Sequence, residues 1–262
     1  MKKINALIVG AAFFCALQNF AHAGLVDEIQ VYDGEINKPG EIGLELHVNT
    51  SLNGKSSQAF DRERVTDQGL RITPELSYGL TDTFELGFYI PTIYTPQYGY
   101  EFAGYKPRIK WMPIQAKNNQ PWSAGINVEY AKLKTGMSES AKSSEVRFIL
   151  GYEGQDWRLA MNPILEKNFS PRTEHTPELE MNFRAIYKQQ GKMKGIGFEY
   201  YHALGLYNDF SPASEQSKQL FFVTEFEFKE GPFKDWDMHF AAGKGWDGAD
   251  PFTVKMIFAP KL

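Results

Sequence analysis

The chain has 262 residues, of which 42% are hydrophobic, and it carries a formal net charge of −4 at pH 7. This modest negative balance excludes a strongly basic, nucleic-acid-binding face as a global property. The mean hydropathy is −0.40, and no stretch after residue 23 is long enough for a transmembrane helix, which excludes a helical membrane protein. A β-barrel is not excluded, because its strands alternate apolar and polar residues and their average hydropathy is diluted.

The first 23 residues have the features of a secretory signal peptide. Lys2 and Lys3 give the positive start, an apolar run covers 6–17, and Ala23 ends a small-x-small cleavage site. We therefore expect export by the general secretory route with cleavage after Ala23. Cys15 follows Phe14 rather than a small residue, which argues against a lipid anchor, and no cysteine remains after cleavage.

Beyond residue 39, apolar and polar residues alternate in runs of about ten, the length that a tilted strand needs to cross a bilayer. Connections between the runs are alternately short, as at 79–83 and 153–156, and mostly longer, as at 50–69 and 91–104. Short turns at one rim and long loops at the other are typical of outer-membrane barrels. The sequence predicts an all-β fold, a transmembrane antiparallel up-and-down β-barrel over 40–262 whose two ends lie at the periplasmic, short-turn rim. The twelve predicted strands lie at 40–50, 70–79, 84–90, 105–112, 122–130, 145–152, 157–165, 178–187, 194–202, 222–228, 236–242 and 252–258.

The polar side of these strands is predicted to face inward. A twelve-strand barrel is too wide for side chains alone to fill as a dry core. With lipid outside, the opposite register would place Arg108 near the bilayer midplane at a cost of roughly 2–4 kcal/mol. The predicted lumen-lining residues are Glu45, His47, Arg71, Glu75, Glu85, Lys106, Arg108, Lys110, Glu129, Glu145, Arg147, Arg158, Glu178, Glu180, Arg184, Glu199, Glu225, Glu227, Asp237, His239 and Lys255.

Aromatic residues test this register independently. Ten of them fall next to the short turns and on the apolar side, where a ring of amphipathic side chains favours the level of the lipid headgroups. This predicted membrane-interface ring comprises Tyr78, Phe84, Trp111, Trp122, Tyr152, Trp157, Tyr187, Phe228, Trp236 and Phe258.

Three segments resemble a family of uncharacterised proteobacterial outer-membrane barrels: Asp27–Ile36 (DEIQVYDGEI), Pro39–Asn49 (PGEIGLELHVN) and Thr73–Thr92 (TPELSYGLTDTFELGFYIPT). That family looks distantly like barrels encoded with phenol meta-cleavage pathways, which are regarded as transporters. The resemblance is clearest over about the first 110 residues, implies an outer-membrane location and carries over no catalytic residue. The chain departs from many such barrels because it ends on Leu262 rather than on an aromatic residue, which leaves Phe258 as the candidate end of the last strand.

The charged inner face is the main functional signal. Lys106, Arg108 and Lys110 form a basic ladder on one strand, and glutamates occupy other strands. This pattern has two interpretations: a pore lining that sets selectivity, or a salt-bridged lumen that only keeps the interior polar and the barrel rigid.

Enzyme and metal chemistry are weakly supported. Histidines of the mature chain lack the His-x-Ser arrangement expected of a barrel phospholipase, so we expect no catalytic residues and no enzyme. Glu45 and His47 share one face, as do Asp237 and His239, and closure of the barrel would bring the two pairs within one strand of each other. We interpret them as polar wall residues, and we expect no metal and no cofactor.

Residues 24–39 precede the barrel and alternate only weakly, so they are either a periplasmic strand, a plug entering the lumen, or a tethered leader. We expect a small-solute channel or transport-associated barrel. The alternative is a non-conducting structural or surface-interaction barrel acting through its extracellular loops. The expected partners are outer-membrane lipids and lipopolysaccharide, the barrel-assembly machinery and small solutes, with no nucleic acid.

Overall fold

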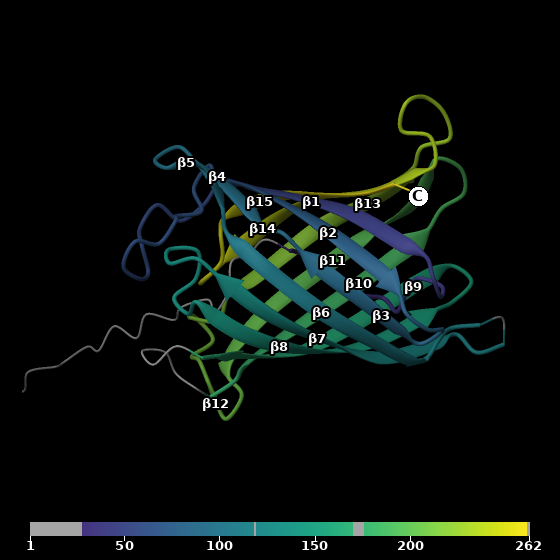
Figure 1. The fold of residues 1–262 in the computed structure, drawn as a ribbon, viewed down its shortest axis with the longest axis horizontal. Coiled ribbons are helices and arrows are strands. Elements are labelled where there is room, and N and C mark those ends of the chain that lie inside the picture. The colour runs from purple at the N-terminus through teal and green to yellow at the C-terminus, as the bar shows by residue number, and fades with distance from the viewer. Residues whose placement is uncertain (1–27, 118, 170–175, 261–262) are drawn as a thin grey trace, which may run out of the picture.

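The computed structural model describes residues 28–117, 119–169 and 176–260, and these form a single closed β-sheet (Figure 1). The predicted signal peptide and its cleavage after Ala23 lie outside the described residues. The strands are β1 (Ile42–Asn53), β2 (Leu70–Gly79), β3 (Phe84–Tyr89), β4 (Thr92–Thr95), β5 (Gly99–Phe102), β6 (Gly104–Ile114), β7 (Trp122–Leu133), β8 (Lys142–Glu153), β9 (Trp157–Asn168), β10 (Glu178–Lys188), β11 (Met193–Leu206), β12 (Asp209–Phe210), β13 (Lys218–Glu227), β14 (Trp236–Trp246) and β15 (Phe252–Pro260).

The sheet closes on itself by pairing its first strand with its last. β1 is hydrogen-bonded to β2 on one side and to β15 on the other, and every pairing between these strands is antiparallel. β3 and β4 both pair with β2, so they are two halves of one wall strand, and β5 and β6 form another. Since β12 pairs only with β11 in a loop, the described residues form a twelve-strand up-and-down barrel, which confirms the predicted fold class.

The prediction was wrong at 91–104, which is not an open loop. β4 and β5 form a hairpin that extends the wall beyond β3 and β6 (Figure 1). Pro91 has no backbone N–H to donate to the ladder, so the strand is interrupted there. The pairing resumes around it, because Ile90 N donates to Pro74 O at 3.0 Å and Ala103 N donates to Pro91 O at 2.9 Å.

The two faces of the wall differ as the alternation predicts. On β2, for example, Arg71 and Thr73 are buried whereas Leu76 is 54% exposed on the outer side. Large apolar residues cover the outside around the whole barrel, including Phe88, Ile109, Leu150, Phe198 and Phe222. So much exposed apolar surface is stable only against another apolar phase, as on a membrane-spanning barrel.

No helix among the described residues is long and apolar enough to cross a membrane.

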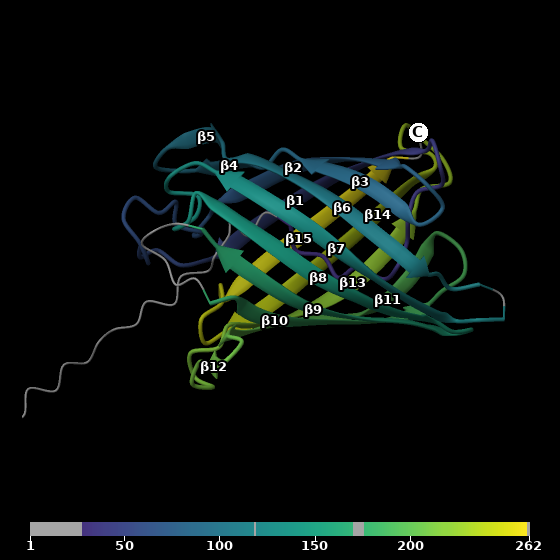
Figure 2. The ribbon, with the colours of Figure 1, turned by 60° about the horizontal axis from the view of Figure 1, so that its bottom comes forward.

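The barrel has two unlike rims (Figure 2). The short-turn rim carries the connections 80–83, 154–156 and 189–192, and the long-loop rim carries 54–69 and 207–217. At the long-loop rim, the carboxylate of Asp250 accepts hydrogen bonds from the hydroxyls of Ser51 and Thr66 and, at 3.1 Å, from the backbone N–H of Lys55. The loop after β1 is thereby fastened to the loop before β15.

Candidate functional site

Residues 28–37, here called the lumenal segment, run through the interior of the barrel before β1 begins. The segment is extended but pairs with no strand, so its backbone groups need side-chain partners. Three inward cations from different strands supply them. Lys255 Nζ donates to Ile29 O at 2.7 Å, Arg147 Nη1 to Gln30 O at 2.8 Å, and Arg184 Nη1 to Val31 O at 3.3 Å.

Tyr32 is the most strongly fixed residue of the lumenal segment. The Asn162 side chain on β9 accepts from Tyr32 N at 2.7 Å and donates to Tyr32 O at 2.9 Å, as a neighbouring strand would. The Tyr32 hydroxyl shares a 2.5 Å hydrogen bond with the Tyr89 hydroxyl. Further along, Ser123 Oγ donates to Asp33 O at 3.1 Å, and Asn37 N donates to Glu85 Oε2 at 2.8 Å.

Apolar packing holds the same segment against one side of the wall. Ile29 and Val31 are 4% and 1% exposed, and they belong to a buried cluster with inward-facing Ile186, Phe221 and Val223. These wall residues occupy positions that alternation assigns to the polar face. Alternation alone does not identify them as core residues, because their apolar partners come from a segment far away in the chain.

A network of ion pairs centred on Arg108 fills the lumen beside β2, β3 and β6. Arg108 contacts the carboxylates of both Glu75 and Glu85, the latter at 2.8 Å, and Lys110 Nζ lies 2.9 Å from Glu85. These side chains are nearly inaccessible, so the charges interact in a medium of low polarizability and are costly to leave unpaired. The remaining member of the basic ladder, Lys106, lies 3.0 Å from Glu129. Every cation of the ladder is therefore paired with a glutamate.

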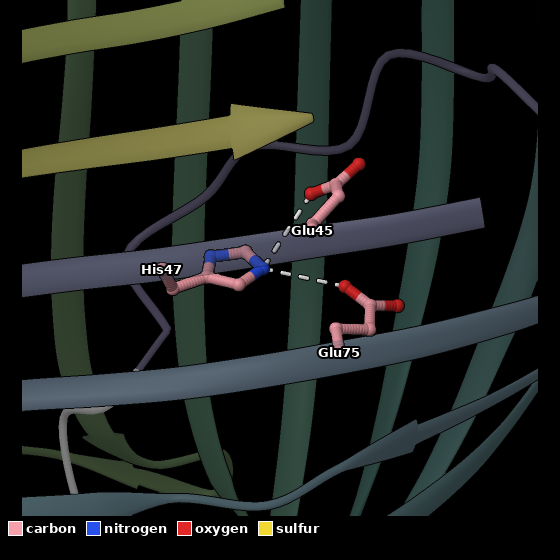
Figure 3. A group of neighbouring side chains, drawn as sticks. All are labelled: Glu45, His47 and Glu75. Carbon is pink, nitrogen blue, oxygen red and sulfur yellow. Dashed lines mark hydrogen bonds and ion pairs between the residues drawn. The ribbon is translucent and has the colours of Figure 1, made fainter. Parts of the chain in front are cut away.

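His47 continues this network towards β1. Its Nε2 lies 3.3 Å from Glu75 Oε2 and 3.5 Å from Glu45 Oε2, and the two carboxylates flank the imidazole ring (Figure 3). A histidine between two carboxylates resembles a metal site, and the three ligand atoms lie within 4.8 Å of one another. However, Arg108 already pairs with Glu75 and Glu85, and Lys110 pairs with Glu85. Because cations of the wall already pair with these glutamates, we interpret the group as part of the ion-pair network.

A second network surrounds Glu199, which is fully buried on β11. Lys255 contacts one carboxylate oxygen directly, the Tyr201 hydroxyl donates to it at 2.7 Å, and His239 Nε2 lies 3.5 Å from the other oxygen. Arg184 joins Glu199 to Glu225, which also accepts from Arg158 at 2.8 Å. Asp237 and His239 lie one strand away from Glu45 and His47, as predicted, because His47 and His239 both lie opposite Ile257 of β15.

The residues predicted to line the lumen are all buried or half-buried, on the inner side of their strands. The residues of the predicted aromatic ring lie at strand ends next to the short turns, with Phe228 just beyond the end of β13. Three pairs among them touch across neighbouring strands: Phe84 with Trp111, Trp122 with Tyr152, and Trp157 with Tyr187, with ring centroids 5.9, 4.8 and 5.2 Å apart. Their role at a membrane interface stays a prediction.

The lumenal segment lies between two cavities. The long-loop cavity, of 150 Å³, is lined by Glu28, Ile29 and Gln30 and by the long-loop halves of β6 to β11. The short-turn cavity, of 410 Å³, is lined by residues 30–35 and by the ends of strands near the short-turn rim. Both cavities have strongly charged walls, and the segment occupies the space between them.

A closed twelve-strand barrel with an apolar outside and a polar inside is a transmembrane β-barrel. The sequence matches no protein-family model and none of the curated proteins. In structure, the chain is similar to an outer-membrane channel from Pseudomonas putida F1, with a TM-score of 0.61 and 9% identity over 89% of this chain and 99% of that one. It is also similar to the KdgM porin, with a TM-score of 0.52 and 8% identity over 84% of this chain and 99% of that one.

At these identities the likeness establishes the barrel architecture alone. The likeness agrees with the sequence resemblance to outer-membrane barrels in general. It does not bear on the resemblance to barrels of phenol meta-cleavage pathways, and the expectation that the protein is not an enzyme stays a prediction.

Proposed function

We propose that the protein is an outer-membrane channel or transport-associated barrel for small solutes, with a charged lumen that the lumenal segment divides. The observation that carries the proposal is the pair of charged cavities on either side of that segment, within a closed barrel whose outer surface is apolar. A wall built only for rigidity needs no open volume, whereas a solute route needs a chamber at each rim.

The similarity to the Pseudomonas putida F1 outer-membrane channel and the KdgM porin supports this proposal at the level of architecture. We propose further that the chain reaches the outer membrane by the general secretory route, with cleavage after Ala23. It would be inserted by the barrel-assembly machinery, with lipids and lipopolysaccharide around its apolar face.

Conductance of the purified protein in planar lipid bilayers tests the proposal. Lys106 lines the long-loop cavity, so Lys106→Glu reverses one charge on the solute route. We expect the reversal potential to show a higher permeability for cations relative to anions. Ile109→Leu on the outer face is the matched control and should leave the potential unchanged, because it keeps the apolar surface. Heat-modifiable gel mobility on the same preparations shows that each variant is folded.

The alternative is a non-conducting structural or surface-interaction barrel that acts through its extracellular loops. The pairing of Lys106, Arg108 and Lys110 with glutamates favours it, because a salt-bridged wall also serves rigidity alone. A folded protein that shows no conductance, both as wild type and after the lumenal segment is loosened, would leave this alternative and remove the channel.

A further inference from the structure

The long-loop cavity holds more acidic groups than its cations offset. Among the described residues that line it, the basic ones are Lys106 and Arg147. Six carboxylates against these two cations leave an excess of four negative charges when all are ionised. The acidic residues of the lining are Glu28, Glu129, Glu145, Glu166, Glu178 and Glu180.

Four of these glutamates form one row across β7, β8, β9 and β10. Glu145 lies directly opposite Glu129 on one side and Glu166 on the other, and Glu166 in turn lies opposite Glu178. Like charges in directly opposed positions destabilise a sheet. Arg147 lies 2.9 Å from Glu145, but within the described parts of the chain no ion pair involves Glu166 or Glu178. Among the residues that the structure describes, the row therefore ends in two carboxylates without an ion-pair partner.

A second observation at the same cavity also calls for a donor. Asn182 is 2% exposed, and its Oδ1 has no hydrogen-bond partner among the described residues. The Oε1 of Glu28, whose side chain is 4% exposed, has none either. Buried polar atoms without a partner are rare in folded proteins, and an acceptor is satisfied only by a donor. Asn182 is uncharged, so this need for donors is independent of the excess negative charge.

The spacing of the row favours a chain-like cation over a metal ion. Neighbouring strands lie about 4.8 Å apart, so four of them extend over roughly 14 Å. A calcium ion instead gathers its oxygen ligands within about 2.6 Å of one point. Metal-ligating groups of three converge, within the described residues, only at Glu45, His47 and Glu75, outside this cavity.

Amines supply what the cavity lacks, because each ammonium group brings one positive charge and three N–H donors. The cavity of 150 Å³ exceeds the roughly 10–15 Å³ that one water needs by about tenfold, which leaves room for a short aliphatic chain. We propose that the long-loop cavity binds linear aliphatic diamines and polyamines, with ammonium groups at Glu166 and Glu178 and a donated hydrogen bond to Asn182 Oδ1. This inference names a solute class for the proposed channel and rests on that function for its biological use, but binding itself requires no conduction.

Isothermal titration calorimetry of the folded full-length protein in detergent, at low salt, tests the proposal with 1,4-diaminobutane as the probe. We expect saturable binding of the diamine, weaker binding of 1-aminobutane and none of 1,4-butanediol, which has the same length without charge. Binding should be about tenfold weaker in Glu166→Gln/Glu178→Gln, which removes two ion pairs. It should also weaken in Asn182→Leu, which removes the acceptor.

Glu227→Gln is the matched control, because this glutamate faces Lys194 and Lys229 near the short-turn rim and does not line the cavity. It should bind the diamine as the wild type does. The double variant removes repulsion from the row and is expected to fold, which heat-modifiable gel mobility will check. Absence of diamine binding by the folded wild type, unchanged binding by the double variant, or displacement of the diamine by a tighter-binding calcium ion would each overturn the proposal. These outcomes are independent of conductance, so they separate this inference from the proposed function.

Discussion

Removing Arg108 should destabilise the barrel more than removing any exposed cation. Arg108→Met leaves Glu75 and Glu85 buried, each at no more than 3% residue exposure, with one partner fewer. Breaking a buried ion pair from one side costs about 3–5 kcal/mol. His47 remains 3.3 Å from Glu75 and Lys110 remains 2.9 Å from Glu85, so we expect the lower end of that range, about 3 kcal/mol.

Urea-induced unfolding in detergent or lipid vesicles, followed by tryptophan fluorescence and gel mobility, measures this loss. Adding Glu75→Gln to Arg108→Met should restore part of the stability, because it removes one of the stranded charges, and the double-mutant cycle gives the coupling. Lys167→Met is the control: this exposed lysine on β9 should change stability by no more than about 0.5 kcal/mol. If Arg108→Met lost no more stability than Lys167→Met, the ion-pair network would not stabilise the folded barrel.

Three further predictions concern the wall, the lumenal segment and the topology. Gly87→Ala places a methyl group into the Arg108 side chain opposite it and should cost about 1–3 kcal/mol in the same unfolding assay, whereas an unchanged stability would show that Arg108 can move aside freely. Asn162→Leu removes two hydrogen bonds to the lumenal segment and should raise both bilayer conductance and cleavage of residues 28–37 by added protease; unaltered cleavage would contradict the anchoring role. A single cysteine at Ser57 should react with an impermeant thiol reagent on intact cells and one at Gln190 should not, and the reverse pattern would invert the proposed orientation.

The strands could be predicted because their signal is local. The predicted 70–79 coincides with β2, and the predicted starts at Phe84, Trp122 and Trp157 are the first residues of β3, β7 and β9. The period of two also separated the inner face from the outer one, since one side of each strand meets lipid. The hairpin at 92–102 was not predicted, because Pro91 interrupts the alternation of apolar and polar residues there.

Contacts that depend on closure of the barrel could not be predicted from the sequence. Alternation places Arg108 on the inner face, but its pairing with Glu75 depends on how the strands are staggered around the barrel. Similarly, Ile186 and Phe221 look misplaced on a polar face until Ile29 and Val31 lie against them. The row of glutamates was overlooked in part because the predicted strand ended at residue 165 and left Glu166 to the next loop, whereas β9 continues to Asn168.

The route of the lumenal segment has a consequence for biogenesis. Gln30 Nε2 donates to Glu45 on β1 at 3.3 Å, while Lys255 on β15 donates to Ile29 O, so the segment touches both strands of the closing seam. The segment precedes β1 in the chain and is synthesised before β15. The strands can therefore pack around it when the two ends of the sheet meet. Once β1 and β15 pair, the segment can leave only endwise through a rim. A barrel that closed before capturing it would enclose Lys255, Arg147 and Arg184 without their carbonyl acceptors, so we expect capture of the segment and closure of the barrel to occur together.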